Sequence, residues 1–528
     1  MLSGKGLKFR FVTITSKEKI CILDKPDCNP FACPRAAGHL DRVNDAVYDL
    51  LTNEETITRP LIEKYAEKHN VCPFEMTLDV ATWADAVVCD YNYVFDPTVA
   101  LKRFFGEEKK TDMVFLIDEA HNLTERAREM YSQTLIKEDF LAVKRAIKGK
   151  DAKLERALDS CNASFLMLKR QCEDFQVWDN LEELQPRLLR LLGIFEDFLD
   201  ENRTPPESKD LVMNLYFDLR AFLNIYELID DDYRIYTDYT QDGSFRLKLL
   251  CMEPKRLLKQ RMALGRAGVL FSATLLPIRY YKDQLGGEED DYAIYVPSPF
   301  DTKKRLLMVG NDVSTKYTRR NRTEYEKIAN YVNVFTGKVG NYFVFFPSYQ
   351  MLNDTAEVLK EVLEKELEKE SVRIYTQTSG MTEPEKEAFL EVFETNPSCR
   401  NIGLCVMGGI FGEGIDLKED RLIGTVIVGT GLPMVCNEKE LFRTYFEEKL
   451  GTGFEYAYLY PGMNKVMQSA GRVIRTTEDV GAILLLDERF LQKQYQSLFP
   501  REWFPFETVN LDGLEDKLRD FWKGNENG

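Results

Sequence analysis

Short, continuous apolar runs recur along the chain, and most of them end in small or polar residues. The runs occupy residues 86–91, 113–121, 267–277, 341–348, 372–377, 401–409, 423–431 and 481–489. Stretches with apolar residues at three- and four-residue spacing separate many of these runs, and residues 349–370 have the clearest pattern of an amphipathic helix. Apolar strands that alternate with helices are typical of parallel sheets covered on both faces. We therefore predict an α/β protein with two parallel-sheet cores.

A long insertion is predicted to interrupt the first core. From about residue 124 to residue 240 the apolar spacing is helical almost throughout, as in "LTERAREMYSQTLIKEDFLAVKRAIKG". A polar loop that contains two prolines, at residues 200–210, divides this region. We expect an all-helical insertion here.

The overall composition favours a cytoplasmic protein. The 528 residues are enough for three or four domains of about 150 residues each. No apolar run approaches the roughly 18 residues of a membrane span, and the first residues lack the apolar centre of a signal peptide. We expect no membrane partner, and we expect the 11 cysteines to be thiols or metal ligands rather than disulfides.

The net charge of −17 argues against a nucleic-acid-binding protein, because such proteins present basic surfaces. Large enzymes can nevertheless confine positive charge to one channel. Within residues 1–50 the balance reverses, with eight basic residues against six acidic ones. A solvated surface would have a similar composition, so the charge alone does not decide between these readings.

Asp118 and Glu119 end the apolar run "MVFLIDEAH". At the carboxyl end of a strand in a doubly wound sheet, one acid can bind Mg²⁺ while the next orients or deprotonates a water molecule. The structural alternative is a strand that leads into a helix, where acidic side chains interact favourably with the helix dipole.

Three later stretches favour the catalytic interpretation. Ser272 and Thr274 follow a strand-like run, and a glycine-rich loop at residues 407–417 follows another. Arg472 and Arg475 are three residues apart, so on a helix they would share a face. Paired guanidinium groups can neutralise charge on a phosphoryl group in transfer, although an arginine pair is more often a solvated surface.

In their order and spacing, these stretches resemble the motifs of superfamily 2 helicases, and among them the XPD/DinG group of iron–sulfur helicases. The matching stretches are residues 118–121 (motif II), 272–274 (motif III), 345–349 (motif IV), 407–417 (motif V) and 468–475 (motif VI). The resemblance extends over nearly the whole chain. It implies two RecA-like motor domains, the first of them incomplete, with an iron–sulfur insertion and a helical arch insertion.

The resemblance also implies a role for each motif residue. Asp118 would bind Mg²⁺, Glu119 would act as the general base, and Arg472 and Arg475 would stabilise charge on the γ-phosphate of ATP. The residues implied in nucleotide contacts are His121, Gln468, Gly414 and Asp416. Ser272 and Thr274 would couple hydrolysis to movement.

Four cysteines have the spacing C-x6-C-x4-C-x38-C: Cys21, Cys28, Cys33 and Cys72. Four thiolates at one point suit a [4Fe–4S] cluster. Zinc also takes four cysteines, but its common sites pair two closely spaced knuckles, which this spacing lacks. Unrelated thiols are the third possibility. The stretch that begins with Cys72 resembles the segment after the fourth cluster ligand in XPD/DinG proteins.

The phosphate-binding loop G-x-x-x-x-G-K-[ST] does not occur in the sequence. In the family, the stretch that opens this chain lies after motifs I and Ia. The chain is therefore expected to be the C-terminal portion of a longer helicase and to be inactive alone.

The resemblance implies an ATP-dependent 5′–3′ DNA helicase that acts on single-stranded DNA and forked duplexes in repair or replication, as a monomer. The implied segments are residues 1–20, 86–123 and 241–297 (motor domain 1), 21–85 (iron–sulfur domain), 124–240 (arch) and 298–528 (motor domain 2). Two other functions stay open: a DNA-binding module without hydrolysis, and a redox-responsive iron–sulfur scaffold.

Overall fold

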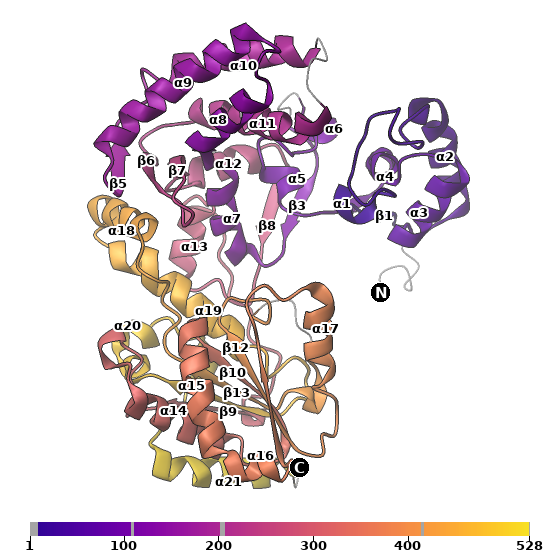
Figure 1. Cartoon of the computed structure of the whole chain (residues 1–528). Coiled ribbons are helices and arrows are strands. Elements are labelled where there is room, and N and C mark those ends of the chain that lie inside the picture. The colour runs from indigo at the N-terminus through magenta and orange to yellow at the C-terminus, as the bar shows by residue number, and fades with distance from the viewer. Residues whose placement is uncertain (1–8, 107–109, 201–205, 413–416, 527–528) are drawn as a thin grey trace. The chain divides into compact units, whose positions relative to one another are not determined.

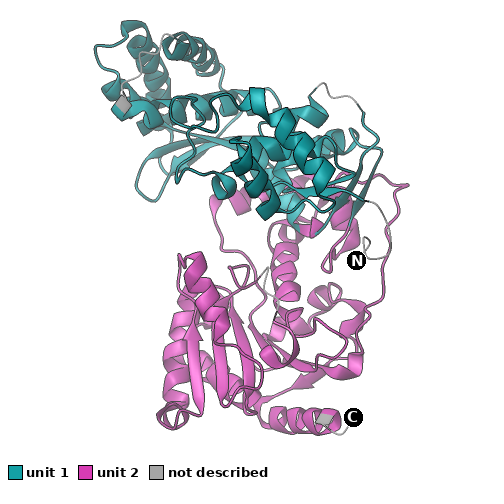
Figure 2. Ribbon diagram, turned by 90° about the vertical axis from the view of Figure 1, so that its right-hand side faces the viewer, with its two compact units in different colours: residues 1–118, 122–270 teal, residues 119–121, 271–528 magenta. Residues whose placement is uncertain are grey.

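The computed structural model describes residues 9–106, 110–200, 206–412 and 417–526. The chain forms two compact units (Figure 2). Unit 1 comprises residues 1–118 and 122–270, and unit 2 comprises residues 119–121 and 271–528. The division falls at residues 270 and 271, whereas the motif pattern placed the end of the first motor domain at residue 297.

The first part of unit 1 is a small helical domain closed by two parallel strands. Its elements are β1 (Phe11–Thr13), α1 (Lys17–Ile20), α2 (His39–Asn53), α3 (Arg59–Lys68), α4 (Pro73–Ala81) and β2 (Ala86–Val88). Helix α2 buries Val43, Val47 and Leu50, which lie three and four residues apart. This spacing directs one apolar face of α2 towards the core of the domain. The short helices α5 (Asn92–Phe95) and α6 (Lys102–Phe105) follow.

A second parallel pair in unit 1 joins β3 (Val114–Ile117) to β8 (Ala267–Leu270). Side chains alternate in their exposure along β3, where Phe115 and Ile117 are buried while Leu116 is 70% exposed. Parallel strands are ordinarily covered on both faces. In this pair the face that carries Val114, Leu116 and Val269 is exposed, so one apolar face is uncovered.

The insertion between β3 and β8 contains a sheet as well as helices, so the expectation of an all-helical insertion is wrong. The helices are α7 (Leu123–Met130), α8 (Lys137–Ala146), α9 (Ala152–Gln171), α10 (Gln185–Asp200), α11 (Lys209–Tyr226) and α12 (Lys255–Met262). The strands are β4 (Gln133–Ile136), β5 (Phe175–Trp178), β6 (Tyr233–Tyr239) and β7 (Phe245–Cys251), in the antiparallel order β4-β7-β6-β5. β6 and β7 are rich in aromatic and aliphatic residues and form a hairpin, whose turn includes Gly243 at φ +82°.

Unit 2 contains a seven-stranded parallel sheet, which confirms the predicted α/β class. The strands are β9 (Arg305–Gly310), β10 (Gly340–Phe346), β11 (Val372–Thr376), β12 (Arg400–Val406), β13 (Gly424–Val428), β14 (Gly481–Leu486) and β15 (Glu507–Val509), in the order β11-β12-β10-β13-β14-β9-β15. All residues of β10, β12, β13 and β14 are buried. Because all neighbours are parallel, the carboxyl ends of the strands share one edge of the sheet.

Helices cover both faces of this sheet (Figure 1). The helices of unit 2 are α13 (Ile278–Gln284), α14 (Arg322–Phe335), α15 (Tyr349–Val362), α16 (Glu364–Glu368), α17 (Glu383–Glu391), α18 (Asn437–Leu450), α19 (Tyr460–Ala470), α20 (Lys493–Gln496) and α21 (Leu511–Glu526). One apolar core lies under α14, α15 and α21, and a second lies under α17 and α19. The predicted helix at residues 349–370 is divided into α15 and α16. Among the described residues, none of the helices combines the length and apolarity needed to span a membrane.

Candidate functional site

The two acids predicted to act on a nucleotide follow β3 directly. Asp118 and Glu119 are both exposed, and the backbone carbonyl of Asp118 accepts a hydrogen bond from Tyr91 Oη at 2.5 Å. Glu119 has a φ of +46°, which is rare for a residue other than glycine. Such backbone conformations are concentrated at functional sites, because the surrounding structure must hold them in place.

His121 is buried and contacts the stretch predicted as motif III. Its Nδ1 lies 2.7 Å from Ser272 Oγ and 3.2 Å from Thr274 Oγ1. Ser272 Oγ donates to Glu119 Oε2 at 3.1 Å and accepts the backbone N–H of Thr274 at 3.1 Å. The structure therefore brings the two stretches together through side chains that the sequence had singled out.

Gln468, in the last turn of α19, contacts the other side of the same imidazole ring, Nε2 against Nε2. An amide nitrogen only donates, so His121 Nε2 accepts this hydrogen bond and its proton lies on Nδ1. The hydrogen bonds then run in one direction, from Gln468 to His121, from His121 to Ser272 and from Ser272 to Glu119. Three motifs that are far apart in the sequence share one chain of hydrogen bonds.

The two predicted arginines do not lie on a helix, so the expected shared helical face is wrong. Helix α19 ends at Ala470, and Arg472 and Arg475 lie in the turn that follows. Buried Asp479 holds this turn by accepting the backbone N–H of Arg475 at 2.6 Å and that of Thr476 at 2.7 Å. These bonds replace the helical pattern that the sequence spacing suggested.

Arg472 points to the glycine-rich loop, where its Nη2 donates to the carbonyl oxygen of Gly412 at 2.5 Å. The described part of the loop follows β12, and Phe411 anchors it by stacking on Phe389 at 4.3 Å between ring centroids. Gly414 and Asp416, the predicted nucleotide contacts of this loop, lie outside the described residues.

The four cysteines predicted to hold a metal cluster all lie in the small domain of unit 1. Cys21 ends α1, Cys72 precedes α4, Cys33 is buried and Cys28 is exposed. Across the described residues, no three side chains of cysteine, histidine, aspartate or glutamate converge as a metal site would require. The cluster geometry is therefore absent from this arrangement of the four side chains.

Opposing effects act on the pKa of the Cys72 thiol. Burial raises the pKa of the Cys72 thiol, while the backbone N–H groups of Glu75 and Phe74 act to lower it. The Cys28 thiol also contributes to the increase, so the two sulfurs are near enough to interact. The backbone N–H of Leu23 donates to Cys21 Sγ at 3.5 Å. The donor set fits a thiolate-bound group, although the side chains do not converge on one.

A polar contact at the carboxyl edge of the unit 2 sheet was not predicted. Buried Gln377 follows β11, donates to Tyr349 Oη at 2.9 Å and accepts the backbone N–H of Val406 at 2.9 Å. It therefore ties the stretch predicted as motif IV to the end of β12. A glutamine that ends a strand is the only signal the sequence offered.

Two family models match the chain. The model DEAD_2 matches residues 3–140, and the model described as helicase C-terminal domain matches residues 331–506. Together they cover more than half of the chain.

Curated relatives are ATP-dependent helicases. The chain is 23% identical to the ATP-dependent DNA helicase YoaA of Escherichia coli, over 79% of this chain and 66% of the relative. It is 23% identical to the ATP-dependent DNA helicase XPD of Sulfolobus acidocaldarius, over 81% and 74%. The probable ATP-dependent helicase MJ0942 of Methanocaldococcus jannaschii is 26% identical over 43% of this chain. The chain spans 35% of the length of MJ0942 and just under two thirds of YoaA.

Solved structures show the same fold. A structure named XPD helicase aligns with a TM-score of 0.55 and 19% identity, over 95% of this chain and 91% of that one. The Xpd4 structure of S. tokodaii aligns with a TM-score of 0.54 and 16% identity, over 96% of both chains. The parallel sheets of the two units thus match the two RecA-like domains of these proteins. Together with the two family models, this places the chain among the XPD/DinG-type superfamily 2 helicases.

Proposed function

We propose that the protein is an ATP-dependent DNA helicase that moves 5′ to 3′ along single-stranded DNA. The observation that carries this proposal is the chain of hydrogen bonds through His121, which joins motifs II, III and VI. A structural histidine needs only one or two partners, whereas this one contacts each motif expected to respond to the nucleotide. Forked duplexes in repair or replication are the proposed substrates, and a monomer is the proposed state.

Hydrolysis in this proposal needs one acid for the metal and one for the water. Asp118 would hold the Mg²⁺ ion that accompanies ATP and neutralises part of its charge, and Glu119 would take a proton from the attacking water. Arg472 and Arg475 would stabilise the charge that develops on the γ-phosphate. Gly414 and Asp416 would complete the nucleotide contacts.

The same hydrogen bonds offer a route for coupling. When Glu119 changes its charge or position during hydrolysis, Ser272 loses or gains a strong acceptor, and His121 and Gln468 must adjust in turn. In this way α19 senses the state of the acid that activates water. Ser272 and Thr274 are thus proposed as coupling residues rather than catalytic ones.

We further propose that a phosphate-binding segment packs on the pair β3 and β8. The uncovered apolar face of this pair, with Leu116, Val114 and Val269 exposed, supports a further layer there. Without a loop to cradle the phosphates, the chain by itself is proposed to be inactive as an ATPase.

The four cysteines are proposed as ligands of a [4Fe–4S] cluster, which would supply a rigid cross-link within the small domain. Cys21, Cys28, Cys33 and Cys72 would bind it as thiolates. The N–H groups at the start of α4 favour the thiolate form of Cys72. If the chain never hydrolyses ATP, a DNA-binding module or a redox-responsive iron–sulfur scaffold is the remaining function, and the second of these requires the cluster.

The catalytic assignment is tested by Glu119→Gln in a form of the protein extended by a phosphate-loop segment. We expect ATP turnover with single-stranded DNA to fall at least about 100-fold, because the amide cannot accept a proton. Binding of a fluorescent ATP analogue should stay within about twofold of the unsubstituted protein. Glu125→Gln, on α7 a few residues away, is the matched control and should leave turnover unchanged. Undiminished turnover in Glu119→Gln would refute the role of Glu119.

A further inference from the structure

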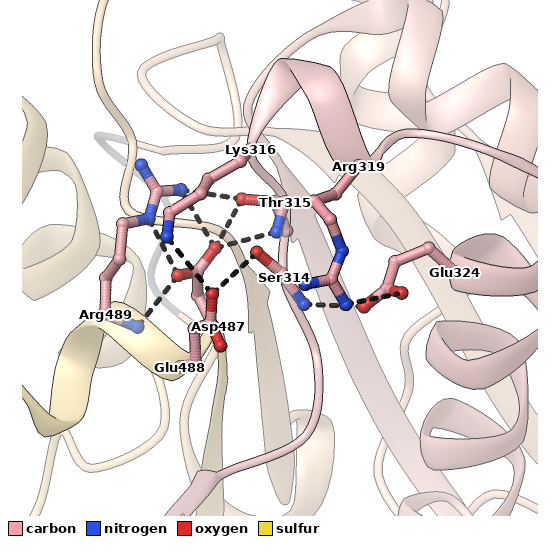
Figure 3. A network of polar contacts seen from close by, with 8 residues as sticks. All are labelled: Ser314, Thr315, Lys316, Arg319, Glu324, Asp487, Glu488 and Arg489. Atoms are coloured by element: carbon pink, nitrogen blue, oxygen red, sulfur yellow. Dashed lines mark hydrogen bonds and ion pairs between the residues drawn. The ribbon is translucent and has the colours of Figure 1, made fainter.

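The loop that follows β9, residues 311–321, is fixed at its base by buried polar contacts (Figure 3). Thr315 donates to Asp487 Oδ2 from its backbone N–H at 2.9 Å and from its hydroxyl at 2.6 Å. Arg489 Nη2 donates to Thr315 Oγ1 at 2.9 Å, and Arg489 Nε donates to Asp487 Oδ1 at 2.8 Å. Asp487 is fully buried, so this carboxylate would be costly to leave without its partners.

Neighbouring contacts hold the rest of the loop. Ser314 donates its backbone N–H to Glu324 Oε1 at 2.6 Å and its hydroxyl to Glu488 Oε1 at 3.0 Å. Arg320 Nε donates to the carbonyl oxygen of Thr315 at 3.2 Å. The backbone of the loop is therefore tied to β14, to α14 and to itself, which restricts the positions that its exposed side chains can take.

This fixed backbone presents an exposed aromatic ring among cations. Tyr317 is 84% exposed, and the Arg320 guanidinium lies 5.7 Å from the centre of its ring. Lys316, Arg319 and Arg322 complete a group of four basic residues within residues 316–322. Lys316 forms an ion pair with Glu488, Arg319 with Glu324, and Arg322 with Glu326 and Glu361. A single exposed tyrosine is ordinary. A rigidly mounted one beside basic side chains can bind single-stranded nucleic acids by stacking and by phosphate contacts, and the exposed ion pairs of Lys316 and Arg322 are weak enough to exchange for phosphate.

The position of the loop supports the same ligand. The loop follows the carboxyl end of β9. Residues 347–349 after β10 and residues 407–412 after β12 lie at the same edge of the sheet. Ligands of open α/β sheets bind at this edge. Thr315 also packs closely against Gly429, which follows β13. A Cβ atom added to Gly429 would lie only 2.7 Å from Thr315 Oγ1.

We propose that residues 314–322, named here the 314–322 loop, form a contact for single-stranded nucleic acid. The ring of Tyr317 stacks on a base, and Lys316, Arg319 and Arg320 contact phosphates. Asp487, Thr315 and Arg489 are positioning residues that hold the loop. This inference rests on the proposed function and adds to it a named contact for the strand. An acidic peptide would satisfy the cations but would leave the ring without a flat partner, so nucleic acid is the favoured ligand.

The test measures binding of a fluorescently labelled oligo(dT) to the full chain by anisotropy, across a range of salt concentrations. Tyr317→Ala should weaken binding about tenfold, the order expected for the loss of one base–aromatic stack, whereas Tyr317→Phe should retain most of the affinity. Arg320→Gln should reduce the slope of log affinity against log salt by roughly 0.7, as one lost phosphate contact on a single strand predicts.

Two controls match these changes in chemistry and exposure. Tyr292→Ala removes a tyrosine of unit 2 that is 96% exposed, and Arg373→Gln removes an exposed arginine on β11. Both controls should bind like the unsubstituted chain. Unfolding curves of Tyr317→Ala, Tyr317→Phe and the two control variants should coincide with that of the unsubstituted chain, because these side chains are exposed. Arg320→Gln also removes the hydrogen bond from Arg320 Nε to the carbonyl oxygen of Thr315, so its unfolding curve is measured beside its binding curve.

The outcomes separate this inference from the proposed function. If the unsubstituted chain binds oligo(dT) and both loop variants bind equally well, the 314–322 loop is not the contact, while the helicase proposal stands. If the unsubstituted chain binds no oligo(dT), both proposals of DNA binding by this chain are overturned. If polyglutamate binds more tightly than oligo(dT) and the loop variants lose it, the ligand is an acidic protein segment instead.

Discussion

At the scale of single residues, His121 carries the most information about this protein. The residue was expected to contact the nucleotide, and the structure adds partners that the sequence did not specify. Its two ring nitrogens face different stretches of chain, Ser272 and Thr274 on one side and Gln468 on the other. Because the Nε2 atom of Gln468 that faces the ring can only donate, one tautomer of the ring satisfies all of these contacts.

This arrangement predicts the protonation of the His121 ring. In ¹⁵N NMR spectra of histidine-labelled chain at neutral pH, His121 should be the neutral tautomer with its proton on Nδ1. The sequence has only three histidines, so His39→Gln and His69→Gln assign the remaining signals. In Gln468→Leu the ring loses its Nε2 donor, and a mixture of tautomers should appear. A proton fixed on Nε2 in the unsubstituted chain would contradict the hydrogen-bond direction drawn here.

At the scale of elements, the carboxyl ends of the parallel strands gather most of the candidate residues. Loops after β9, β10, β11 and β14 contain polar side chains with hydrogen bonds to other side chains or backbone groups at this edge of the sheet. Buried Asp487 is the clearest case, since it holds the loop of another strand. Burial alone would raise the pKa of Asp487, but Arg489 and Thr315 outweigh burial and keep the pKa below its usual value.

The lowered pKa of Asp487 predicts how its contribution to stability depends on pH. A folded-state pKa below the unfolded-state value of about 4 means that the stabilisation is complete above pH 4 and is lost as the pH falls through the folded-state pKa. At pH 7, Asp487→Ala should destabilise unit 2 by about 3 kcal/mol, because it leaves the partly buried Arg489 without its partner.

Urea unfolding of the unsubstituted chain and of Asp487→Ala, followed from pH 7 to pH 3, measures this effect. The difference between the two proteins should be constant down to about pH 4 and should shrink below it. Asp301→Ala removes an exposed acid that caps a short turn, and it should cost less than about 1 kcal/mol. A difference that grows as the pH falls would show that the sign of the pKa shift is wrong.

At the scale of the whole molecule, the small domain of unit 1 carries the four cysteines that are spaced as metal ligands. The spacing of Cys21, Cys28, Cys33 and Cys72 favours a cluster, while the described side chains do not converge on a common point. Burial raises the pKa of the Cys72 thiol and so disfavours the thiolate, while the N–H groups at the start of α4 act in the opposite direction. Metal content therefore decides between a cluster, zinc and unrelated thiols.

Protein purified without oxygen is predicted to be brown and to contain about four iron atoms per chain. Cys28→Ser should lose the visible absorbance and most of the iron, since it removes one of the proposed ligands. Cys436→Ser, which replaces an exposed cysteine of unit 2, should retain both. Elemental analysis measures the iron and zinc content of each variant. A colourless chain that contains one zinc ion would contradict the iron–sulfur assignment.

Much of the fold was predictable because its signals are local. Each of the eight apolar runs contains a strand, since short runs rich in apolar residues between helices have few other ways to be buried. The strands β6 and β7 were missed because alternation within a largely helical region is a weak signal, and β9 and β15 were missed as well.

The sequence by itself determined the α/β class, the order of the motifs and the acids that end β3, because these depend on neighbouring residues and on spacing along the chain. Only the tertiary structure decided that Arg472 and Arg475 leave the helix, that His121 joins three motifs, and that Asp487 holds the loop that carries Tyr317. The contacts of His121 and Asp487 join residues 151 to 347 positions apart, and no local preference encodes such pairings.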